Sequence, residues 1–478
     1  NLGMTQLGRV EFSLKGGSVN TDFIDNAGGV DCSDHEVNIK ILLNEVVEAG
    51  DMTGKQRDKL LASMTENVAA LVLANNYKQT QAISLAQRQA VKAMTEYRRY
   101  ISQMEGSGKL SRSLEFIPED DQLAERSARG LGLTRPELSI LISYSKADLK
   151  ESLVDSDVPE DSYLAQELGT AFPAVLEKKY PTALHSHRLR REIISTQLAN
   201  DLVNHMGITF LRRLQQSTGA PPSELARAYV VARDVFQLKT HFAAIEELDY
   251  QVSAEVQLEL MDDLMRLGRR ATRWFVRNRR RDLAPEREIG HFAPRVAALA
   301  EQFDELLEGP VRNQWQSRFE AYAKAGVPDP IARLVAGTTN FFTLLGTIEA
   351  ADTTGQPEQR VAQVFFALGS ELRLPWFGQQ INALAVDNHW QALARESYRD
   401  DLDAQARSMT VSVLHDCNQD LSPEVLVKEW VERNPLMVKR WRVMLSDLKN
   451  AGGGDYPMIA VAMRELLDLA QASRRDLT

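Results

Sequence analysis

Three features are scarce or absent in this sequence: cysteine, a signal peptide and a long uninterrupted apolar run. The two cysteines, Cys32 and Cys417, are too few for a disulfide framework or a four-thiolate metal site. Without a signal peptide, the natural compartment is a reducing one, so we expect a cytoplasmic protein with no membrane partner. The longest apolar window, residues 331–351, contains Arg333 and Glu349, which predicts a buried helix rather than a membrane span.

Positive charge is also in deficit, because the 478 residues carry a formal net charge of −10. This balance argues against general binding to nucleic acid or to anionic membranes, so we expect no nucleic-acid partner. The length allows about two to four domains, each able to bury its own core. The sequence starts at Asn1 rather than at methionine, and we expect it to be the later part of a longer protein.

Glycine is concentrated at the beginning of the chain, with eight of the 27 glycines in residues 1–54. Within this segment Val10, Phe12 and Leu14 alternate with polar residues, which predicts a strand that stops at the glycine pair 16–17. Residues 19–24 predict a second short strand. We therefore predict a short α/β segment over residues 1–50 that forms part of a larger domain.

The residues between that second strand and the next helix form the strongest candidate site. Gly28 and Gly29 lack a Cβ, so the backbone can bend tightly and a ligand can approach it closely. Ser33 and Glu36 have capping-box spacing, which predicts a helix that begins at or just after Ser33. A glycine turn before a helix start can receive an anion, and Asn26 could bond a ribose hydroxyl or a carboxamide. The alternative is a purely structural turn.

From residue 51 onwards the sequence predicts helices almost throughout, which makes the protein mainly α. Thr134, Pro136 and Glu137 mark one helix start, since they combine a capping box with proline in the first turn. The charged, proline-bearing stretch 283–290 is the best candidate for a boundary. We therefore predict a helical domain in two parts, residues 51–285 and 286–478.

Arginines form a second candidate surface. Arg266, Arg270, Arg273 and Arg277 repeat at helical spacing, and Arg269, Arg279, Arg280 and Arg281 lie beside them. Phosphate contacts come mainly from such residues, so this face could bind an anionic partner. Because acidic residues flank the run on both sides, we favour a solvated helix or one that faces another subunit.

Several sequence blocks resemble one enzyme family. The block Asn26-Ala27-Gly28-Gly29-Val30 followed by Ser33 resembles a block near the end of the nucleotide-binding domain in the glutamate dehydrogenase family. The longer runs 20–26 and 33–42, and the stretches 65–73 and 76–80, are similar to the large NAD-specific members. Those members carry a long helical extension after the catalytic domain. The terminal region 434–466 also resembles the end of that family.

The resemblance implies a fold, a reaction and a set of site residues. It implies that residues 1–50 end a Rossmann-type nucleotide-binding domain, followed by a large helical C-terminal domain. It implies an NAD-dependent enzyme of amino-acid catabolism that converts L-glutamate to 2-oxoglutarate and ammonium, as a homo-oligomer. Asn26, Gly28, Gly29 and Asn1 would lie on the cofactor side, and Ser33 would contact the substrate carboxylate.

The family's catalytic lysine and aspartate have no counterpart in this sequence. No catalytic residue can therefore be assigned, and we expect this chain alone to be inactive. Two alternatives stay open. The complete enzyme could act on a branched or aromatic amino acid, or the chain could be a non-catalytic helical scaffold that binds anionic partners through the arginine face Arg266–Arg281.

Overall fold

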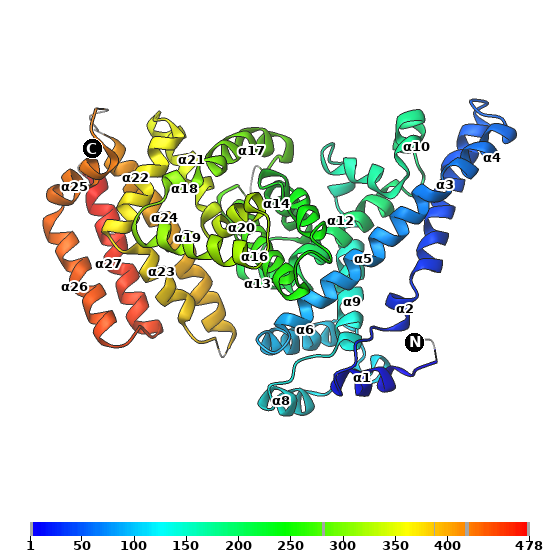
Figure 1. Cartoon of the computed structure of the whole chain (residues 1–478), viewed down its shortest axis with the longest axis horizontal. Helices are drawn as coiled ribbons and strands as arrows, with labels where there is room; N and C mark the ends of the chain where they lie inside the picture. The colour runs from blue at the N-terminus through cyan, green and yellow to red at the C-terminus, as the bar shows by residue number, and fades with distance from the viewer. Residues whose placement is uncertain (1–2, 280–282, 387, 416–419, 476–478) are drawn as a thin grey trace. The chain divides into compact units, whose positions relative to one another are not determined.

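The computed structural model describes residues 3–279, 283–386, 388–415 and 420–475, and every regular element within them is a helix (Figure 1). The prediction of a mainly α protein is therefore confirmed. The two predicted strands are wrong, because their residues lie in helix α1 (Gln6–Leu14) and around the short helix α2 (Asp22–Asp25). No strand of a Rossmann-type domain occurs in the described part of residues 1–50.

The chain divides into two compact units. Unit 1 contains the described residues within 1–231 and 275–286, and unit 2 those within 232–274 and 287–478. The helices of unit 1 after α2 are α3 (Gly28–Glu48), α4 (Gly54–Ser63), α5 (Thr65–Gln89), α6 (Met94–Gly106), α7 (Arg112–Glu115), α8 (Asp120–Ala128), α9 (Arg135–Val154), η1 (Val158–Glu160), η2 (Leu164–Ala171), α10 (Ala174–Lys179), α11 (Pro181–His185), α12 (Arg190–Met206) and α13 (Phe210–Thr218).

Three helices contain residues of both units, and the remaining helices belong to unit 2. The shared helices are α14 (Pro222–Val235), α16 (Ala254–Arg279) and α17 (Pro285–Glu301). Unit 2 also contains α15 (Leu238–Glu246), α18 (Phe303–Leu306), α19 (Gly309–Lys324), α20 (Asp329–Phe341), α21 (Thr343–Thr354), α22 (Glu358–Glu371), α23 (Leu374–Ala383), α24 (His389–His415), α25 (Pro423–Arg433), α26 (Pro435–Asn450) and α27 (Tyr456–Arg475).

Local capping explains why α1 is a helix. The Thr5 side chain accepts a hydrogen bond from the backbone N–H of Gly8 at 3.1 Å, which satisfies a donor in the first turn. The alternating apolar residues do not share a buried face, since Val10 is 6% exposed and Phe12 is 48% exposed. The alternation of apolar and polar residues here therefore does not correspond to a strand.

The predicted start of α9 is confirmed. The backbone N–H and the hydroxyl of Thr134 both donate to Glu137 Oε2, at 2.7 and 2.8 Å, and the helix begins at Arg135. Arg126 donates from Nη1 to both oxygens of the buried Glu137 at 2.8 Å. The Glu137 carboxylate thus accepts from charged and neutral donors, which offset the free-energy cost of burying it. Helix α9 then packs against α5 and α12 at the centre of unit 1.

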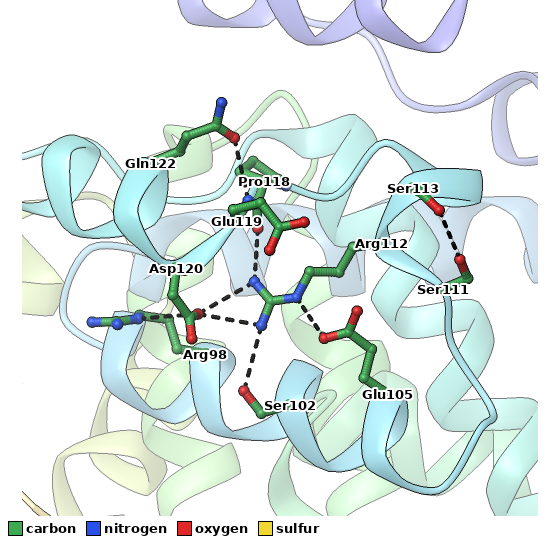
Figure 2. A network of polar contacts seen from close by, with 10 residues as sticks. All are labelled: Arg98, Ser102, Glu105, Ser111, Arg112, Ser113, Pro118, Glu119, Asp120 and Gln122. Carbon is green, nitrogen blue, oxygen red and sulfur yellow. Dashed lines mark hydrogen bonds and ion pairs between the residues drawn. The ribbon is translucent and has the colours of Figure 1, made fainter.

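A buried arginine joins three short elements of unit 1, as Figure 2 shows. Arg112 Nε donates to Glu105 Oε2 at 2.7 Å, and its Nη1 donates to the carbonyl of Pro118 at 2.9 Å. Both terminal nitrogens also lie 3.2 Å from Asp120 Oδ1. Arg112 therefore ties the end of α6 to α7 and to the first turn of α8.

The core of unit 2 is built around aromatic side chains. Trp441 is fully buried, donates from Nε1 to the carbonyl of Leu372 at 2.9 Å, and meets the ring of Phe377 edge to face. Trp430 donates from Nε1 to Ser412 Oγ at 3.1 Å. Each indole thus keeps its polar atom satisfied while it fills the core between α22, α24 and α26.

The apolar window near residue 340 forms two helices rather than one. Helices α20 and α21 break at Phe342 and are bent by 64°, and Leu344 and Ile348 are fully buried. Among the described residues no single helix has the length and apolar composition needed to cross a membrane, and this bent pair meets the criterion only when its two helices are joined.

We predict that Arg112→Met destabilises unit 1 by about 2 kcal/mol, because it removes a buried guanidinium that links Glu105 and Asp120 and takes a donor from the buried carbonyl of Pro118. Arg57→Met is the matched control, since Arg57 pairs with its neighbour Asp58 at the surface, and we expect a change below about 1 kcal/mol. The measurement is amide hydrogen exchange in α6–α8 under native conditions. All six tryptophans lie in unit 2, so tryptophan fluorescence during urea unfolding serves as an internal reference. Equal protection of the α6–α8 amides from exchange in both variants would contradict this role of Arg112.

Lys146 gives a pH-dependent prediction. Its Nζ donates to the neutral Gln79 Oε1 at 3.0 Å, and burial lowers the pKa of Lys146 to about 7. Between this value and the ordinary lysine value the unfolded chain binds more protons, so this group makes stability rise with pH across that window. Lys146→Met should therefore stabilise the chain at pH 7, and the gain should shrink towards pH 10. Urea unfolding of this variant and of the exposed Lys150→Met at both pH values tests this, and an identical gain at both would refute it.

Candidate functional site at the start of helix α3

The predicted site residues lie on an exposed helix start. Helix α2 ends before Asn26, Ala27 has a helical backbone without a capping side chain, and α3 begins at Gly28. The first N–H groups of a helix have no acceptor within the helix. The start of this 21-residue helix therefore presents free donors and a partial positive charge.

The expected tight bend at the glycine pair is wrong. Neither Gly28 nor Gly29 has a positive φ, and both belong to the first turn of α3. A Cβ built on Gly29 would meet no atom within 4 Å, and one on Gly28 would lie 3.8 Å from Val72 Cγ1. The chain's own packing does not require glycine here, so the pair leaves open space beside the helix start.

The expected helix start at Ser33 is also wrong. Ser33 lies in the second turn of α3, where its exposed hydroxyl donates to the carbonyl of Gly29 at 3.2 Å. Glu36 does not close a capping box and instead forms an ion pair with Lys40, one turn further along. The helix extends back to Gly28 because Ala27 already has helical dihedral angles. Ser33 and Gly29 are therefore neighbours on one side of α3.

Asn26 completes this exposed stretch. Its Nδ2 donates to the carbonyl of Asp22 at 3.2 Å, which holds the amide over the end of α2. Asn26, Gly29 and Ser33 are all exposed, and Gly28 is half-buried. Asn1, the remaining predicted residue, lies outside the described residues.

Two histidines that sequence reasoning did not assign to the site fix α3 against the helices of unit 1. Buried His35 donates from Nδ1 to the carbonyl of Ala171 at 3.0 Å, because a carbonyl can only accept. His187 accepts at Nδ1 from the N–H of Leu189 at 3.1 Å and donates from Nε2 to the carbonyl of Asn38 at 3.0 Å. Both nitrogens of His187 are therefore used by the backbone, in agreement with a structural role.

Arg135 holds the segment that precedes the site. Its Nε donates to Asn20 Oδ1 at 3.0 Å, and its Nη1 donates to Ser84 Oγ at 2.9 Å. Asn20 in turn donates from Nδ2 to Asp25 Oδ1 at 2.7 Å, beside Asn26. Burial lowers the pKa of Arg135, and the nearby Asp25 opposes that shift. The only sequence signal for this contact was the position of Arg135 at the start of α9.

The predicted arginine face is solvated only in part, because Arg266 and Arg277 are exposed whereas Arg270 and Arg273 are half-buried. Arg273 pairs with Glu396 at 2.8 Å and with Asp400 at 2.7 Å, both on α24. Arg270 lies over the ring of Phe342 and pairs with Asp403 at 3.2 Å. These partners lie more than 120 residues away, so no local pattern could indicate them. Arg280 and Arg281 lie outside the described residues. Nor do the described residues contain a group of three or more potential metal ligands.

The family model "Glutamate dehydrogenase, C-terminal" matches residues 130–468, and the model "Bacterial NAD-glutamate dehydrogenase, catalytic domain" matches residues 1–86. The chain belongs to the glutamate dehydrogenase family. The resemblance seen in the sequence blocks is therefore confirmed. The candidate site at the start of α3 lies within the stretch matched by the catalytic-domain model, and most of the helical part lies within the C-terminal match.

Three curated relatives, each named NAD-specific glutamate dehydrogenase, are similar along nearly the whole chain. The Pseudomonas aeruginosa protein is 61% identical over 474 residues, the Halomonas elongata protein 47% over 473, and the Mycobacterium tuberculosis protein 35% over 478. These alignments cover 99%, 99% and 100% of this chain. The chain spans 29% of the length of each relative.

Proposed function

We propose that this chain is the C-terminal portion of an NAD-dependent enzyme that converts L-glutamate to 2-oxoglutarate and ammonium. The observation that carries the proposal is the position of the Asn26–Ser33 stretch, which lies within the catalytic-domain match and forms an exposed, uncapped helix start. The names of the three relatives support the choice of NAD and glutamate.

The residues at the start of α3 fit a dinucleotide. The open space above Gly29 allows a ligand to approach the backbone, and the free N–H groups there suit an anionic or carbonyl acceptor. The Asn26 amide can donate to and accept from a ribose or a carboxamide. When bound, NAD accepts the hydride that leaves the substrate. In this proposal Asn26, Gly28 and Gly29 orient the cofactor, with Asn1 a further candidate.

Ser33 has a separate part in the proposal. Its hydroxyl now donates to the carbonyl of Gly29, and it can turn to donate to a substrate carboxylate instead. Such a bond orients the substrate but moves no proton. The lysine and aspartate that do the chemistry would come from elsewhere in the complete enzyme, so this chain alone should not produce NADH.

The helical part would serve assembly or regulation, within a homo-oligomer in a reducing cytoplasm. The division into residues 1–50, 51–285 and 286–478 stays a prediction. Another amino-acid dehydrogenase is the competing function, and a panel of branched and aromatic substrates distinguishes it. An anion-binding scaffold has less support, because Arg270 and Arg273 already pair with carboxylates of α24.

The test uses the complete enzyme with two substitutions at the start of α3. Gly29→Val fills the open space, so we expect KM for NAD to rise at least about tenfold with little change in KM for glutamate. Ser33→Ala removes one hydrogen bond to a charged group, and KM for glutamate should rise about 10- to 100-fold. Steady-state kinetics with each substrate varied separately gives both values.

Each variant has a matched control. Gly54→Val changes the first residue of α4, where a Cβ also meets nothing within 4 Å. Ser152→Ala removes the same kind of bond, from a serine hydroxyl to the carbonyl four residues earlier, on α9. If the α3 variants behave like these controls, the site assignment fails. If the complete enzyme and its well-folded variants turn over a branched or aromatic amino acid in place of glutamate, the substrate assignment fails.

A further inference from the structure

Unit 2 contains a cavity of about 700 Å³ where the ends of several helices meet. Its charged lining comes from the start of α19, the junction of α22 and α23, and helices α25 and α26. These residues are Glu308, Glu371, Arg373, Glu424, Lys428 and Arg442. The volume lies within the range of about 300–1,000 Å³ that is usual for small-molecule sites. None of these residues belongs to the candidate site on α3.

Three cationic side chains from three separate parts of the chain line this cavity. Arg442 forms an ion pair with Glu371. Arg373 and Lys428 form no ion pair with any residue that the structure describes, although carboxylates line the same cavity. These two cations therefore share the cavity with Glu308 and Glu424 without a direct ion pair to either, and each can still bind an anionic group of a ligand.

The backbone at Arg373 is unusual. Its φ of 55° and ψ of 33° are in the left-handed region, at the position after α22 where glycine is the common residue. A side chain there is strained relative to relaxed backbone. The conformation fixes the direction in which Arg373 leaves the junction, on the rim of the cavity. An arginine thus stands at a backbone position that glycine would adopt more easily.

Two carboxyl groups of the cavity lie together. Burial and a hydrogen bond to Glu424 raise the pKa of Glu308. Ser422 Oγ donates to Glu424 Oε2 at 2.5 Å and stabilises that residue as the ionised partner. Since Glu371 is paired with Arg442 and the other two carboxyl groups lie together, Arg373 and Lys428 are the lining groups that can bind an anion.

We propose that this cavity binds a small molecule carrying two anionic groups, carboxylates or phosphates, held by Arg373 and Lys428. Arg442 closes one side and keeps its pairing with Glu371. A cavity of this size admits a metabolite rather than a segment of nucleic acid. The site requires only unit 2, so it does not depend on the function proposed for α3.

The experiment is calorimetric titration of the 478-residue chain with three probes: succinate, inorganic phosphate and ADP. We expect saturable one-to-one binding of succinate or ADP, weakened by salt. Tighter binding of succinate identifies a dicarboxylate site, and tighter binding of ADP identifies a phosphate site. Binding of inorganic phosphate as tight as that of succinate and ADP would contradict a site for two anionic groups. No binding of any probe at concentrations up to about 10 mM would overturn the proposal.

Two variants locate the binding. Arg373→Gly removes the guanidinium and suits the left-handed backbone, and Lys428→Met removes an exposed charge, so both should fold normally. Each should weaken binding at least about tenfold, as expected for one charge-assisted hydrogen bond. Lys449→Met, an exposed residue of α26 outside the cavity, should leave binding unchanged. Equal weakening in all three variants, or none in the first two, would refute the site.

Discussion

An all-helical chain depends on contacts between its helices, because hydrogen bonds within a helix do nothing to place it against another. Many helices here are short and marginal when isolated, so tertiary contacts decide where they lie. In several places that contact is a guanidinium shared between elements. Arg112 joins α6, α7 and α8, Arg135 joins α9 to the segment before α3, and Arg273 joins α16 to α24. The planar fork of arginine suits this role, since it can serve several acceptors at once.

Prediction from the sequence succeeded where the deciding contact lies within a few residues and failed where the local pattern fitted more than one structure. The start of α9 was predicted correctly because Thr134 and Glu137 form their capping box within four residues. The strand at residues 10–14 was wrong because five residues of alternating polarity fit either structure, and the Thr5 cap decided in favour of a helix. The family resemblance, by contrast, was carried by whole sequence blocks and did not depend on any local structure.

The candidate site was found in the right stretch and for partly wrong reasons. Glycine was expected to allow a bend, whereas Gly28 and Gly29 have helical dihedral angles and leave open space. Ser33 was expected to cap α3 and is instead bonded to Gly29 within it. The supports of α3 could not be predicted, because His187 and Asn38 are 149 residues apart. Pairs so distant in sequence leave no periodic signal.

The imidazole of His187 has a consequence for chemical labelling. Both of its nitrogens are occupied by main-chain groups and the ring is buried, whereas His185 is exposed two residues earlier. An acylating reagent for histidine should therefore modify His185 while the native chain keeps His187 out of reach. Reaction at His187 would report that α3 had separated from its neighbours, so one pair of residues supplies both the signal and its reference.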